Sequence, residues 1–113
     1  MSTQNIQRLM TELGERISNN KRAKELTGEM NEARKRGDWQ KVAEILDATY
    51  STYFDLHQKT EVIKGLADST RSDMGEECYR GLKAKLDSYK SEVEIMMEQI
   101  SDVRQGIEWR IQP

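Results

Sequence analysis

The sequence predicts an all-α fold, an elongated antiparallel three-helix bundle or long helical hairpin with a kinked or split N-terminal helix. Three observations lead to this prediction. Apolar residues recur at steps of three and four over long stretches. The single proline is Pro113, so no proline interrupts the helices before it. The chain is 35% hydrophobic and 34% charged, which suits helices that each bury one stripe better than a compact sphere.

The first helix is expected at about residues 3–36, with a break near residues 18–20. Its apolar residues form two short stripes that are out of phase across Ser18-Asn19-Asn20: Ile6, Leu9, Leu13 and Ile17, then Ala23, Leu26, Met30 and Ala33. Either Asn19 or Asn20 can cap the second piece, because an Asn side chain accepts from free N–H groups at a helix start. We therefore predict one kinked helix or two short ones.

The second helix is expected at about residues 39–67. Gly37 can adopt the left-handed conformation that ends a helix, and Asp38 can cap the next one. Trp39 then opens an unbroken stripe, so we expect it to be the first core residue of this helix rather than an exposed contact. The stripe is Trp39, Val42, Leu46, Thr49, Tyr53, Leu56, Thr60, Ile63 and Ala67, widened by Ile45, Phe54 and Leu66.

The third helix is expected at about residues 73–111, after a turn in which Ser72 or Asp73 is the N-cap. Its stripe is Tyr79, Leu82, Leu86, Tyr89, Val93, Met96, Ile100, Val103 and Ile107, with Ile111 one turn later. If residues 63 and 79 face each other across the turn, Trp39 lies beside Asp102 or Val103. The last residues then extend beyond the second helix. Residues 1–113 are predicted to form one domain.

Groups that could perform catalysis are few. His57 and Cys78 are the single residues of their kinds, and the carboxylates have no Glu-x-x-His companion that would indicate a di-metal bundle. We predict no catalytic residue, no cofactor and no metal site, and hence no enzyme. The net charge of -2 and the short basic runs argue against nucleic acid. The chain has no membrane-length apolar run, and its lone cysteine favours a cytoplasmic location.

The segment from Arg36, Gly37, Asp38 and Trp39 through Leu56 resembles FliT-type flagellar export chaperones. The similarity covers residues 36–56, including Leu46 and Tyr50 or Tyr53, together with the overall helical layout. It implies a small cytosolic helical chaperone that holds the C-terminal helix of an export substrate in an apolar groove. It also implies a C-terminal segment that covers the groove when idle.

We therefore predict a non-enzymatic, chaperone- or adaptor-like protein that binds an amphipathic helix of another protein, with a homodimer as a possible state. The alternative is a structural coiled-coil subunit of a larger assembly, or a small phage- or plasmid-type accessory factor that binds a host protein. The apolar stripes place the groove at Tyr53, Leu56, Leu86, Tyr89, Val93 and Met96. Ile107, Trp109 and Ile111 extend beyond the second helix, so the resemblance implies that they form the mobile cover, with Trp39 close to them.

Overall fold

Residues 2–111 are described by a computed structural model, and almost all of them lie in helices. In chain order the elements are α1 (Thr3–Ser18), α2 (Lys21–Lys35), α3 (Trp39–Ser69), α4 (Arg71–Met74), α5 (Glu76–Gly106) and the short 3-10 helix η1 (Glu108–Arg110). They form a rod of 57 × 22 × 17 Å. The predicted all-α, elongated fold is confirmed.

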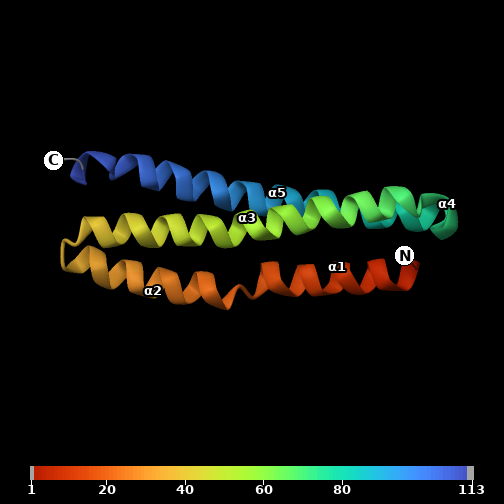
Figure 1. Ribbon diagram of the computed structural model, residues 1–113, viewed down its shortest axis with the longest axis horizontal. Coiled ribbons are helices and arrows are strands. Elements are labelled where there is room, and N and C mark those ends of the chain that lie inside the picture. Colours follow the sequence, from red (N-terminus) through yellow and green to blue (C-terminus); the bar gives the residue numbers. More distant parts are fainter. Residues whose placement is uncertain (1, 112–113) are drawn as a thin grey trace.

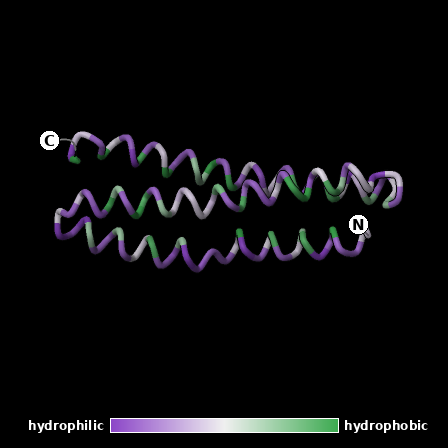
Figure 2. Tube along the Cα trace, in the orientation of Figure 1, coloured by the Kyte–Doolittle hydropathy of each residue, from purple (hydrophilic) through white to green (hydrophobic). Residues whose placement is uncertain are grey.

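The two long helices form an antiparallel pair, and the N-terminal region lies along it. Figure 1 shows α1 and α2 end to end on one side of α3, with α5 on the other side. The N-terminus lies near α4, and the C-terminus lies near the joint between α2 and α3. Hydrophobic and hydrophilic stretches alternate along each long helix (Figure 2), as expected when every helix buries one stripe.

The N-terminal helix is broken where the phase of its apolar stripe changes. α1 ends at Ser18, and Asn20 caps α2 by accepting a hydrogen bond at 3.1 Å from the backbone N–H of Ala23. The two pieces keep nearly the same direction (Figure 1). The predicted break near residues 18–20 is thus confirmed, and Asn20 rather than Asn19 is the N-cap.

The joint between α2 and α3 is a tight helix-ending motif. The N–H of Gly37 donates to the carbonyl of Arg34, and the N–H of Asp38 donates to the carbonyl of Ala33, each at 3.0 Å. Gly37 has φ +71°, the left-handed conformation that this motif requires. The Asp38 side chain then accepts from the N–H of Lys41 at 3.2 Å, so α3 begins directly at Trp39.

The turn between α3 and α5 differs from the prediction. α3 continues to Ser69 and is followed by the single turn α4, so α5 begins only at Glu76, after Gly75 at φ +86°. Ser72 and Asp73 therefore lie inside α4 and do not cap α5. Arg71 fixes the turn by binding both carboxylate oxygens of Glu76, at 2.6 and 3.0 Å.

Because the turn lies later in the chain, the register between α3 and α5 also differs from the prediction. Three cross-helix pairs define it, namely Glu61 with Lys90, His57 with Glu94, and Asp47 with Arg104. In this register Trp39 lies beside Arg110, not beside Asp102 or Val103. α5 ends at Gly106, not at 111, so the long overhang beyond α3 is not formed.

One continuous core runs along the rod. The predicted stripes supply all of its members except Met10. The buried residues are Ile6, Met10, Leu13, Ile17, Ala23, Leu26, Ala33, Val42, Ile45, Leu46, Tyr53, Leu56, Ile63, Ala67, Tyr79, Leu82, Leu86, Val93 and Ile100. Thr60 is also buried, and its hydroxyl donates to the carbonyl of Leu56 at 2.9 Å. Phe54, which was predicted to widen the core stripe, is instead 44% exposed.

Candidate protein-binding groove

An apolar groove of about 300 Å³ lies between α2 and α5, with α3 as its floor. α2 and α5 both pack against α3 but scarcely against each other, so the half of the rod that contains α2 is open along this side. The residues that line the groove are Ile17, Ser18, Asn20, Ala23, Lys24, Thr27, Met30, Leu46, Thr49, Tyr53, Met96, Gln99, Ile100 and Val103. We call this surface the α2–α5 groove.

The lining of the groove is suited to apolar contact. The hydroxyls of Thr27 and Thr49 are already used, since they donate at 2.8 Å to the carbonyls of Ala23 and Ile45. These hydroxyls are thus satisfied within their own helices and need no partner from a bound ligand. Burial raises the pKa of the Tyr53 phenol, and the negative charge of Glu92 raises it further, so Tyr53 stays neutral at physiological pH.

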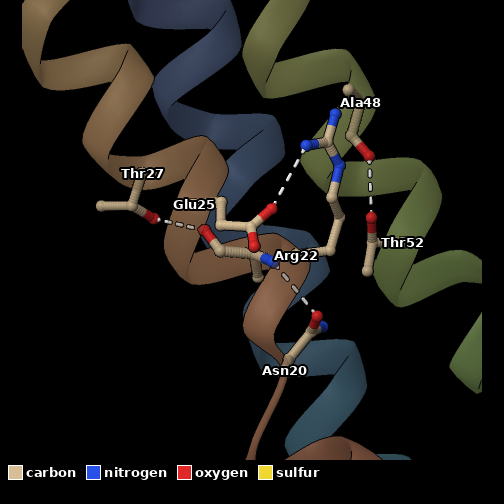
Figure 3. A network of polar contacts seen from close by, with 7 residues as sticks. Asn20, Arg22, Glu25, Thr27, Ala48 and Thr52 are labelled. Carbon is tan, nitrogen blue, oxygen red and sulfur yellow. Dashed lines mark hydrogen bonds and ion pairs between the residues drawn. The ribbon is translucent and has the colours of Figure 1, made fainter.

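The polar end of the groove is at the start of α2. Figure 3 shows Asn20 capping this helix, with Arg22 directed toward Glu25 and Thr27 bonded to the backbone. The ion pair between Arg22 and Glu25 is 3.5 Å long and exposed, so it contributes little to stability. The Nζ of Lys24 donates to the Oδ1 of Asn19 at 3.3 Å.

Of the residues predicted to line a groove, Tyr53 and Met96 do line it. Leu56, Leu86 and Val93 are at most 4% exposed and belong to the core. Tyr89 faces α1, where its hydroxyl packs so closely against Gly14 that a Cβ added there would require the Tyr89 side chain to shift. The predicted stripe thus contains groove residues and core residues side by side.

The predicted cover residues lie beyond the groove, whose lining on α5 ends at Val103. Ile107 is partly buried against the core, and Ile111 is half-buried. Trp109 is 68% exposed. The Arg110 guanidinium lies 4.3 Å from the ring centroids of both Trp39 and Trp109, so this cation holds the two rings together. Trp39 itself is partly buried and packs against the core.

Sequence reasoning missed the whole α2 side of the groove. Ala23, Thr27 and Met30 lie on α2, and Gln99 and Ile100 add to the α5 side. The sequence did carry a signal, since the second stripe of the N-terminal helix is made of Ala23, Leu26, Met30 and Ala33. Two small residues in a stripe of four leave space beside the helix.

The groups considered for catalysis lie in separate contacts. The Nε2 of His57 is 3.1 Å from Glu94, whereas the Sγ of Cys78 accepts from the Gln7 amide at 3.8 Å. Among residues 2–111, no group of three or more His, Cys, Asp or Glu side chains is arranged to hold a metal ion. Within the same range, no helix has both the length and the apolar character needed to cross a membrane.

Comparison of the chain with protein-family models, with curated proteins and with solved structures gave no match in any of the three. The resemblance of residues 36–56 to flagellar export chaperones therefore remains a prediction.

Proposed function

We propose that this protein is a non-enzymatic, chaperone- or adaptor-like binding protein that holds an amphipathic helix of another protein in the α2–α5 groove. The observation that carries the proposal is an apolar groove between two helices that pack against the same third helix. α2 and α5 share α3 as a neighbour but leave an apolar channel between them. A partner helix laid in that channel would complete a four-helix arrangement.

The dimensions and chemistry of the groove support this proposal. On α3 the floor extends from Leu46 to Tyr53, which is two helical turns or about 10 Å. Met30 lines the α2 wall, and Met96 lines the α5 wall. Because methionine side chains are unbranched and flexible, such walls adapt to apolar side chains of different shape.

A flagellar or type III export chaperone acting in the cytoplasm is the more specific form of this proposal, and only the resemblance of residues 36–56 supports it. The alternative is a coiled-coil subunit of a larger assembly or a phage- or plasmid-type accessory factor. The coiled-coil form has less support, because the stripes that would zip two chains together are buried within one chain. Tyr53, Leu56, Leu86 and Val93 are all at most 9% exposed.

The test uses two substitutions on α5 that differ in their position relative to the groove. Val103 lines the groove and is 50% exposed, whereas Ile95 lies outside it and is 55% exposed. Val103→Arg places a charge in the apolar channel, and Ile95→Arg places the same charge on the outer face. Both sites are already half open to water, so both variants should fold with nearly unchanged stability.

We expect the unmodified protein to capture a partner from native lysate at one-to-one stoichiometry. The purified partner should bind Ile95→Arg with unchanged affinity and Val103→Arg at least about tenfold more weakly, which corresponds to about 1.4 kcal/mol. Titration calorimetry measures both affinities. Equal affinity for the two variants, or large homo-oligomers with no stoichiometric partner, would contradict the proposal.

A further inference from the structure

The two helices that border the α2–α5 groove run in the same direction. Each is antiparallel to α3, so α2 and α5 are parallel to each other (Figure 1). A fourth helix that lies between them can be antiparallel to both only if it runs in the direction of α3. Antiparallel neighbours place opposite ends of their helix dipoles side by side, which is the electrostatically favourable arrangement. The geometry of the walls thus favours one orientation of the occupant.

The end of the groove next to the break between α1 and α2 is positive. α2 begins there with Lys21, so its N-terminal N–H groups contribute a partial positive charge. Lys24 is the one charged side chain among the described residues that line the groove. Its Nζ donates to the neutral Asn19 amide at 3.3 Å. An occupant that brings a negative group to this end is therefore favoured.

One acidic residue, Glu92, adds a negative charge near this end of the groove. Glu92 on α5 is near enough to Tyr53 for its charge to raise the pKa of that phenol. Lys24 and Asn20 belong to the α2 side of the same end, while Glu92 belongs to the α5 side. A negative group on the occupant is therefore attracted to the α2 wall and repelled from the α5 wall.

We propose that the occupant of the groove is a single amphipathic helix of a partner protein that runs in the direction of α3. An Asp or Glu in its last turn contacts Lys24. This inference rests on the proposed function and adds the direction and the charge of the bound helix to it.

A display library of helical peptides about 14 residues long, each about 21 Å, tests the inference directly. The library fixes one apolar face, varies the polar positions in the first and last turns, and ends in an amide. We expect selected peptides to carry Asp or Glu in the last turn. A photo-cross-linker in the first turn should label the protein near Met30 and Val103. In the last turn it should label Ser18 and Tyr53.

Two variants and one control measure the contribution of each contact. Lys24→Gln should lower the affinity for the selected acidic peptides by about two- to fivefold. It should leave the affinity for their Asp→Asn or Glu→Gln forms unchanged. Asn20→Asp keeps the cap on α2 but adds a negative charge at this end of the groove, so it should also weaken the binding of the acidic peptides. Lys21→Gln is the control, since Lys21 lies on the same turn but outside the groove lining.

The possible failures can be distinguished. Peptides that cross-link in the groove but show no acidic preference, or that run in the opposite direction, overturn this inference and leave the proposed function intact. A library from which no peptide cross-links to the groove overturns both.

Discussion

At the scale of single residues, Gly37 decides where the second long helix begins. Its φ of +71° allows the two backbone hydrogen bonds that end α2, and Asp38 then caps α3. For an ordinary residue with a side chain, this left-handed backbone conformation costs about 1–2 kcal/mol.

We therefore expect Gly37→Ala to lower the free energy of unfolding by about 1 kcal/mol. Gly28→Ala is the matched control, because Gly28 lies inside α2 and an added Cβ would meet nothing within 4 Å. That change should raise the free energy of unfolding by about 0.5–1 kcal/mol, since alanine favours the helix interior. Urea denaturation measures both changes, and a shift of the same sign in both variants would contradict the role of Gly37.

Single residues also show how far the sequence could be interpreted. Steps of three and four identified Leu56, Leu86 and Val93 as inward-facing, and all three are buried. The same steps could not separate these core residues from Tyr53 and Met96, which line the groove. Whether an inward-facing residue is covered depends on how far apart the neighbouring helices lie, and periodicity within one helix does not report that distance.

At the scale of the elements, cross-helix ion pairs accompany the register of α3 against α5. The ion pair with Lys90, whose Nζ lies 2.9 Å from the Oε1 of Glu61, lowers the pKa of the Glu61 carboxyl below its usual value of 4.5 and raises the pKa of Lys90. A carboxyl with a lowered pKa in the folded state stabilises the fold above its unfolded pKa. That contribution is lost as the pH falls through the folded pKa.

Between about pH 6 and pH 3, the unmodified protein should therefore lose stability more steeply than Glu61→Gln. The free energies of unfolding of the two proteins should become equal at the acidic end of this range. Lys90→Gln should flatten the profile in the same way, because it removes the other partner of the pair. The effect is small, since both side chains are partly exposed. Thermal melts across this range measure it, and profiles that stay parallel would rule the ion pair out as a contributor to stability.

The register itself was beyond the sequence prediction. The prediction centred the turn on residues 68–75, where turn-forming side chains are dense, but α3 continues to Ser69 and α4 adds a further turn. Helical continuation keeps the backbone groups of this segment hydrogen-bonded, as in the bonds from Thr70 to Leu66 and from Met74 to Thr70. The chain reverses only at Gly75, whose φ of +86° few other residues would adopt.

At the scale of the whole molecule, the α2–α5 groove follows from the broken N-terminal helix. α1 packs against both α3 and α5, whereas α2 packs mainly against α3. Beyond the break at Asn19 and Asn20, the bundle therefore changes from three mutually packed helices to an open arrangement. The sequence predicted the break, but its consequence for packing requires the relative positions of three helices.

The methionines allow the central claim, that a partner helix occupies this groove, to be measured directly. Met30 and Met96 line the groove, whereas Met97 and Met74 pack elsewhere against the core. With isotope-labelled methionine methyl groups, each of these residues gives its own NMR signal. Addition of the partner helix should shift the signals of Met30 and Met96 and leave those of Met97 and Met74 in place. Shifts at Met97 or Met74 with Met30 and Met96 unchanged would contradict the account.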